Sequence, residues 1–121
     1  MTIRKNKKGE LRELFKGSFA QCNLLKMKKN TFWGGHYHQK TKEFFYLFRG
    51  KIEAVFIPVE FSTLRLIQNK RQTRTYSQNQ SFTVSPYTMH NLKIIEPTLC
   101  LVLYSHPFNP KDPDLYQAKN I

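Results

Sequence analysis

Cysteine is scarce in this chain of 121 residues, which contains only Cys22 and Cys100. The two are far apart in sequence and no Cys-x-x-Cys pair occurs, so a disulfide scaffold is not predicted. Each falls in an apolar, strand-like run, and we therefore expect both to be buried free thiols.

Long apolar runs are also missing. The longest, residues 44–48 and 99–104, are far too short to span a bilayer. The first ten residues are charged and no apolar segment follows them, so they do not have the pattern of a signal peptide. We expect a cytoplasmic protein that does not contact the membrane.

Acidic residues are few: 8 Asp and Glu stand against 20 Lys and Arg, which gives a formal net charge of +12. A basic surface attracts polyanions and nucleotides. The basic residues are spread along the whole chain without a base-reading motif, which favours a solvated surface over nucleic-acid binding. The length fits one domain over residues 1–121, with a flexible basic arm (1–10) and a C-terminal tail (107–121).

Helical periodicity is absent as well, whereas ten Phe and six Tyr favour strands. Short apolar runs separated by turn residues predict an antiparallel β-barrel or sandwich, without a helix longer than about two or three turns. The expected strands are residues 17–29, 32–38, 43–49, 52–59, 64–67, 72–77, 81–85, 90–95 and 99–105.

Histidine is rare, yet three of the four histidines form a pattern. His36 and His38 are two residues apart, which on a strand places both side chains on one face about 7 Å apart. Glu43 opens the next expected strand, and a carboxylate inside a barrel is costly unless it is paired or bound to metal. His90 can reach the same point only through the fold. Three imidazoles and one carboxylate suit Zn, Fe, Mn, Ni or Cu, and we predict a divalent metal site.

Two motifs give this pattern a family resemblance. Residues 35–50 read Gly-His-Tyr-His-x4-Glu-x6-Gly, and after a variable insert comes Pro86-Tyr-Thr-Met-His90. In order and spacing they resemble the two motifs of the cupin superfamily, although Asn79 stands where the second motif usually opens with Gly. The resemblance implies an all-β double-stranded β-helix, a jelly-roll-like barrel, with metal held by the four residues above.

A narrower resemblance covers residues 34–45 and the tail segment 108–114. Both are similar to cupins of surface-polysaccharide synthesis: the cupin domain of capsular UDP-sugar epimerase-reductases, and nucleotide-sugar 3,4-ketoisomerases, in which the His-x-His pair is thought to act without metal. This likeness implies an anionic nucleotide-sugar substrate. It also implies a homodimer built by strand exchange or edge pairing, in which residues 11–25 are the expected crossing segment.

The predicted function is therefore that of a metal-binding sugar epimerase or isomerase, which abstracts a proton α to the carbonyl of a nucleotide-linked keto sugar. The candidate catalytic residues are His38, Tyr46 and Tyr104. The candidate substrate-binding residues are Arg49, Tyr37 and Tyr87, since alternation places Arg49 on the strand face of Glu43. A metal-dependent dioxygenase and a non-catalytic sugar- or effector-binding cupin remain as alternatives.

Overall fold

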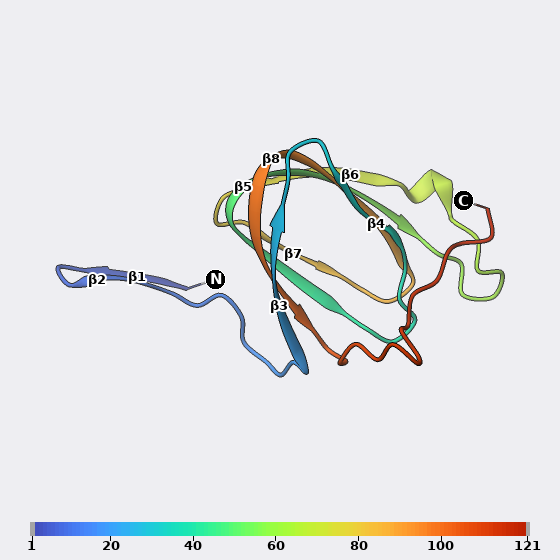
Figure 1. The fold of residues 1–121 in the computed structure, drawn as a ribbon, viewed down its shortest axis with the longest axis horizontal. Helices are drawn as coiled ribbons and strands as arrows, with labels where there is room; N and C mark the ends of the chain where they lie inside the picture. The colour runs from blue at the N-terminus through green and yellow to red at the C-terminus, as the bar shows by residue number, and fades with distance from the viewer. Residues whose placement is uncertain (1, 121) are drawn as a thin grey trace.

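The computed structural model describes residues 2–120 and shows an all-β barrel from which an N-terminal arm projects (Figure 1). Within these residues the one helical element is the short 3-10 helix η1 (Gln68–Lys70). It is neither long nor apolar enough to cross a membrane. The strands are β1 (Ile3–Asn6), β2 (Gly9–Arg12), β3 (Gln21–Met27), β4 (Phe32–His36), β5 (Glu43–Pro58), β6 (Gln72–Ser77), β7 (Ser81–Val84) and β8 (Thr88–Tyr104).

Two long strands, β5 and β8, organise the barrel. They pair antiparallel from Glu43 opposite Tyr104 to Pro58 opposite Thr88. Short strands extend this ladder on either side: β3 and β4 pair with β8, while β6 and β7 pair with β5. The first half of β5 therefore lies in a sheet with β3 and β7, and its second half lies in a sheet with β4 and β6.

Two predicted chain breaks do not occur. The strands expected at 43–49 and 52–59 are one strand, β5, which continues through Gly50. Those expected at 90–95 and 99–105 are likewise one strand, β8, which continues through Glu96-Pro97. The β5–β8 ladder shifts register between Leu47 and Ile52. Gly50 has a φ of +106°, and a Cβ there would collide with the hydroxyl of Thr98. Glycine thus allows the strand to bulge and bend without ending.

Two apolar clusters fill the barrel. The larger lies between the sheets and consists of Met27, Phe45, Leu47, Ile52, Ala54, Phe82, Val84, Leu92, Ile94, Cys100 and Val102. The smaller closes one end and consists of Tyr37, Ile57, Val59, Leu66, Met89 and Ala118. Cys100 is buried as expected, but Cys22 is exposed because it lies on the outer face of β3.

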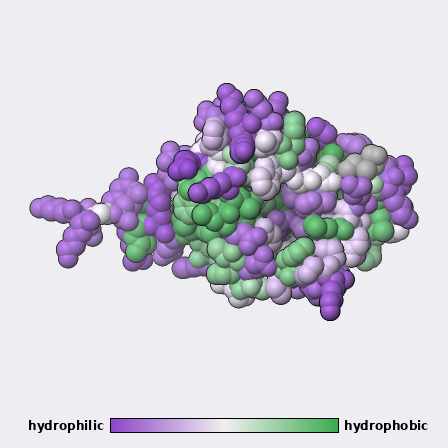
Figure 2. Space-filling model, in the orientation of Figure 1, coloured by the Kyte–Doolittle hydropathy of each residue, from purple (hydrophilic) through white to green (hydrophobic). Residues whose placement is uncertain are grey.

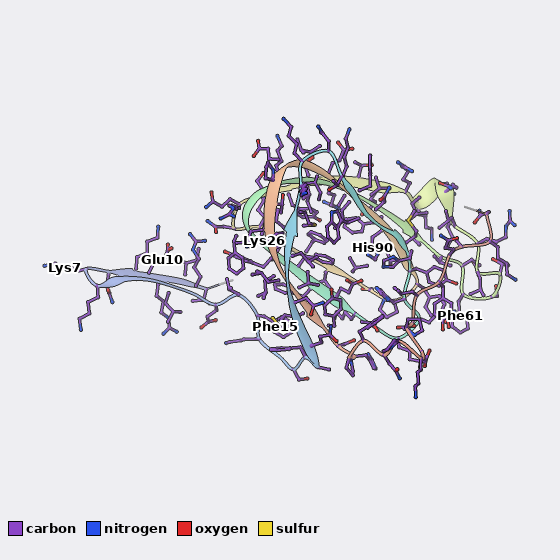
Figure 3. The ribbon with its side chains drawn as sticks, in the orientation of Figure 1. Lys7, Glu10, Phe15, Lys26, Phe61 and His90 are labelled. Carbon is purple, nitrogen blue, oxygen red and sulfur yellow. The ribbon has the colours of Figure 1, made fainter. Side chains whose placement is uncertain are left out.

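The two chain ends lie outside the barrel sheets. The expected basic arm includes the hairpin β1–β2, and charged side chains such as Lys7 and Glu10 spread along it (Figure 3). The C-terminal tail runs along the barrel wall, where Tyr116 forms a bridge with Tyr37. The strand expected at 64–67 is reduced to one bridge between Val59 and Leu66.

Candidate metal centre

Four donor side chains converge inside the barrel: His36, His38, Glu43 and His90, whose ligand atoms all lie within 4.8 Å of one another. His36 ends β4, Glu43 begins β5, and His90 lies in β8 directly opposite His36. The side chain of His90, labelled in Figure 3, lies inside the barrel and is almost fully buried. The fold therefore brings together the four residues that the two motifs predicted.

Gly34 explains how β4 comes so close to β8. It has a φ of +98°, and a Cβ at this position would lie 2.6 Å from the backbone oxygen of His90. The pairing of β4 with β8 is also irregular between Gly34 and His36. As a result the imidazole rings of His36 and His90 meet edge to face, with centroids 4.9 Å apart.

Glu43 lies between two imidazoles. Its Oε1 is hydrogen-bonded to Nε2 of His38 and is 3.6 Å from Nε2 of His90. Burial alone would raise the pKa of Glu43, but the hydrogen bond from His38 and the nearby imidazoles outweigh it and lower this pKa. Burial alone would likewise lower the pKa of His38, yet Glu43 raises it. Each partner thus favours the charged form of the other.

The other two imidazoles stay neutral. Burial and the neighbouring rings of His90 and His38 lower the pKa of His36 to about 4. Burial also lowers the pKa of His90, and its buried Nδ1 has no hydrogen-bond partner within residues 2–120. Neutral imidazole is the form that binds metal ions.

This donor set fits a divalent metal ion. Two donors that each lie about 2.0–2.2 Å from one ion can be separated by at most about 4.4 Å. The 4.8 Å limit in the structure therefore requires only small side-chain movements to close around an ion. Three imidazole nitrogens and one carboxylate oxygen suit Zn, Fe, Mn or Ni and leave positions open for another ligand.

A cavity of about 490 Å³ adjoins the four donors. Gln21 and Asn23 of β3 line it with neutral polar groups, and the amide of Gln21 donates to Asn23 Oδ1 at 3.1 Å. The sequence analysis missed these two residues, although they share a strand face with the buried Met27. Other lining residues include Leu25, Trp33, Lys40, Thr41, Phe45, Leu92, Tyr104, His106, Phe108, Asn109, Asp112, Asp114 and Leu115.

Of the tyrosines predicted to be catalytic, Tyr104 lines this cavity and Tyr46 does not. Burial, reinforced by the nearby Glu43 carboxylate, raises the pKa of Tyr104 to about 12, so its phenol stays protonated. Tyr46 alternates with Phe45 and lies on the other face of β5, where it is buried and its hydroxyl donates to Asn79 Oδ1 at 3.0 Å. This placement corrects the proposal of Tyr46 as a catalytic residue.

The three predicted substrate-binding residues also lie outside the cavity. Tyr37 alternates with His36 and His38, so it points to the opposite side and packs against Tyr87 with ring centroids 5.9 Å apart. Arg49 is exposed, because the bulge around Gly50 breaks the alternation that would have aligned it with Glu43. The structure therefore does not bring Arg49, Tyr37 and Tyr87 to the cavity beside the four donors.

A barrel of this topology, with His-x-His and Glu facing a later His, has the cupin fold, and the all-β prediction is confirmed. Three solved structures with this fold are similar to the chain. QdtA, a sugar 3,4-ketoisomerase from Thermoanaerobacterium thermosaccharolyticum solved with TDP, has a TM-score of 0.75 at 13% identity over 98% of this chain and 84% of QdtA. The dTDP-4-dehydrorhamnose 3,5-epimerase from Sulfolobus tokodaii has a TM-score of 0.72 at 18% identity over 90% of this chain and 69% of the epimerase.

The third is CapF, a capsular polysaccharide assembling protein from Staphylococcus aureus, with a TM-score of 0.67 at 18% identity. The match covers 99% of this chain but only 34% of CapF, so the chain spans about a third of that protein. No protein-family model matches the sequence, and no curated protein is a significant sequence match. At these identities the likeness establishes the fold.

Proposed function

We propose that this protein is a metal-binding cupin that epimerises or isomerises a nucleotide-linked keto sugar in polysaccharide biosynthesis. The observation that carries the proposal is the convergence of His36, His38, Glu43 and His90 beside a cavity of about 490 Å³. The similar solved structures include a sugar 3,4-ketoisomerase and a 3,5-epimerase, which supports sugar chemistry. The pairing of Glu43 with His38 supports the metal-dependent version, since the metal-free alternative predicts that Glu43 pairs with Arg, Lys or Tyr.

The residues around the cavity suit proton transfer next to a carbonyl. An ion on the four side chains would polarise the carbonyl of the sugar and make the neighbouring C–H more acidic. A base removes this proton, and the electron pair of the C–H bond moves toward the carbonyl oxygen until carbon is protonated again. Tyr104, whose raised pKa keeps it protonated at neutral pH, would donate a proton. A water molecule would accept one, because both ring nitrogens of His38 are already occupied, Nδ1 by the Asp114 carbonyl and Nε2 at the donor cluster.

Lys40 would meet the diphosphate of such a substrate. It is the one Lys or Arg among the described residues that line the cavity, and its ammonium lies 3.3 Å from the exposed carboxylate of Asp112. An exposed ion pair of this kind is weak. A diphosphate with more negative charge can therefore replace Asp112 as the partner of Lys40.

The test combines metal analysis with isotope exchange. Protein purified without chelator should contain a divalent metal ion, and it should incorporate deuterium from D2O next to the carbonyl of TDP-4-keto-6-deoxyglucose, the ligand of a QdtA complex. The His90→Ala variant is the control, because it lacks one of the four donors. Metal-loaded protein that catalyses no exchange contradicts the proposal. Oxygen uptake with bound iron would instead indicate the dioxygenase alternative.

A further inference from the structure

The loop between the ligands His38 and Glu43 is held by one residue of the C-terminal tail, Asp114. Its carboxylate accepts hydrogen bonds from three consecutive backbone N–H groups, those of Gln39 at 2.9 Å, Lys40 at 3.0 Å and Thr41 at 2.8 Å. It also accepts one from the Thr41 hydroxyl at 2.8 Å. Successive N–H groups converging on one carboxylate fix the path of a loop, because each additional bond removes an alternative conformation.

The same residue contacts a predicted metal ligand directly. The backbone carbonyl of Asp114 lies 2.7 Å from Nδ1 of His38. A carbonyl oxygen only accepts hydrogen bonds, so Nδ1 carries a hydrogen and donates it. This orients the His38 ring with Nε2 toward Glu43 and the other donors. A second partner of this kind usually fixes the tautomer and the orientation of a ligating histidine.

We propose that Asp114 is a positioning residue of the metal centre: its carboxylate holds the loop between two ligands, and its carbonyl orients the ring of one of them. The inference rests on the proposed metal site but not on sugar chemistry. It also gives a role to the tail segment 108–114. This segment resembles the polysaccharide cupins, and the four donors alone do not explain that resemblance.

The rest of the tail is anchored independently of this loop. Tyr116 and Tyr37 exchange two backbone hydrogen bonds of 3.0 Å, and the amide of Asn120 bonds to both backbone groups of Leu66. A change confined to the Asp114 carboxylate therefore leaves the tail attached downstream. Asp114 has a φ of +52°, a conformation that Asp and Asn tolerate better than most residues.

Asp114→Asn is the appropriate variant for this reason. Asparagine tolerates the same backbone conformation, but its NH2 group replaces an acceptor with a donor that faces other donors. Asp112→Asn is the matched control, since Asp112 lies on the same tail and its carboxylate, among the described residues, bonds only to the exposed Lys40 side chain. Thr41→Val removes a single hydrogen bond to Asp114 and provides an intermediate step.

We expect Asp114→Asn to weaken Zn²⁺ binding by about 10- to 100-fold, as is typical for partners of metal ligands. Thr41→Val should weaken it less, and Asp112→Asn should bind like the wild type. The affinities are measured by competition with a zinc indicator at a temperature well below the unfolding transition. In parallel, ¹⁵N NMR of the metal-free protein should show a protected Nδ1–H on His38 that is lost in Asp114→Asn and kept in Asp112→Asn.

A purely structural role would lower the Tm of Asp114→Asn and leave both the Zn²⁺ affinity and the Nδ1–H signal of the folded protein unchanged. That result overturns the proposal. If the wild type binds no metal ion, the proposed metal-dependent function is wrong. The positioning role of Asp114 is then tested by the NMR signal alone. Its loss in Asp114→Asn supports the positioning role, and its persistence contradicts it.

Discussion

Nε2 of His90 lies 3.6 Å from Oε1 of Glu43, although the two residues sit at opposite ends of the ladder between β5 and β8. His90 is opposite Phe56 in that ladder, whereas Glu43 is opposite Tyr104. Only a barrel that closes on itself brings them together. Neither strand alone can form the centre, so its geometry depends on the whole barrel.

Removal of one donor should empty the centre without unfolding the barrel. We expect His90→Ala to lose most of its bound metal, because the remaining three donors leave one side of the ion without protein. The apolar core does not involve the ion, so the β-sheet circular dichroism spectrum should remain. His106→Ala is the control, since His106 lines the cavity outside the four donors. Equal metal content in both variants, measured by mass spectrometry, would contradict the assignment.

Metal binding should release protons. His38 has a raised pKa because of Glu43, so at about pH 6.5 most molecules carry a proton on this ring that an ion must displace. His36 and His90 have lowered pKa values and contribute none. We expect release of about one proton per ion, and an affinity that falls as the pH falls through the raised pKa of His38.

Calorimetric titration in two buffers of different ionisation enthalpy measures this release. In Glu43→Gln the pKa of His38 loses its main upward cause, so the number of protons released should decrease. An unchanged proton count in this variant would show that Glu43 does not hold the proton on His38.

Gly34 and Gly35 form a matched pair for testing the approach of β4 to β8. Both have positive φ, of +98° and +81°, but only a Cβ at Gly34 would meet the backbone of His90. We expect Gly34→Ala to destabilise the protein by about 1–3 kcal/mol more than Gly35→Ala, the usual cost of overpacking, and to weaken metal binding by displacing His36. Urea unfolding and zinc titration measure the two effects. Equal effects of the two variants would refute the close-approach argument.

Lys40 should matter for phosphorylated ligands only. We expect Lys40→Ala to weaken binding of TDP, with little effect on the affinity for Zn²⁺, because Lys40 lines the cavity but is not one of the four donors. Lys42→Ala is the control, since Lys42 lies in the same loop but does not line the cavity. Similar TDP affinities for the two variants, measured by calorimetry, would remove Lys40 from the binding site.

The homodimer stays a prediction, and the structure shows which parts are available to form it. β3 is an edge strand, and its Leu24 is exposed. Phe15 and Phe19, which precede β3, are exposed as well. Figure 2 shows a hydrophobic patch on the barrel near the arm. An open edge must be covered, and an isolated hairpin such as β1–β2 is marginally stable. Light scattering should give twice the 14.4 kDa of one chain. A monomer at micromolar concentration would count against the dimer.

The four donors were predictable because their signal is local. The alternation of His36 and His38, the position of Glu43 at a strand start and the Pro86-to-His90 spacing each depend on a few neighbouring residues. Tyr37 and Tyr46 were misplaced because the alternation was not applied to them. Once His36, His38 and Glu43 face inward, a residue an odd number of positions away on the same strand points to the other face. Arg49 was misplaced because the β5–β8 ladder already shifts register between Leu47 and Arg49, so the alternation that starts at Glu43 does not extend to Arg49.

The role of Asp114 was not predictable from the pattern of the sequence. It lies 71 positions after Glu43 in a tail without regular structure, and the hydrogen bonds it accepts come from backbone groups that any residue possesses. Gln21 and Asn23 show the intermediate case. Their strand and their shared strand face could be predicted from the sequence. That this face lines the cavity could not, because the cavity is enclosed by elements that come together only in the complete barrel.

The bend of β5 at Gly50 also bears on the order of events in folding. Glu43 precedes Phe56, the partner of His90, by thirteen positions, a distance of about 43 Å along a straight strand. The donors meet only after both sheets have formed and bent. The pairing of strands that are distant in the sequence must therefore come first, and such pairing makes folding slow. An ion that requires all four donors arrives after the rate-limiting step. It would therefore slow unfolding and leave the rate of folding unchanged.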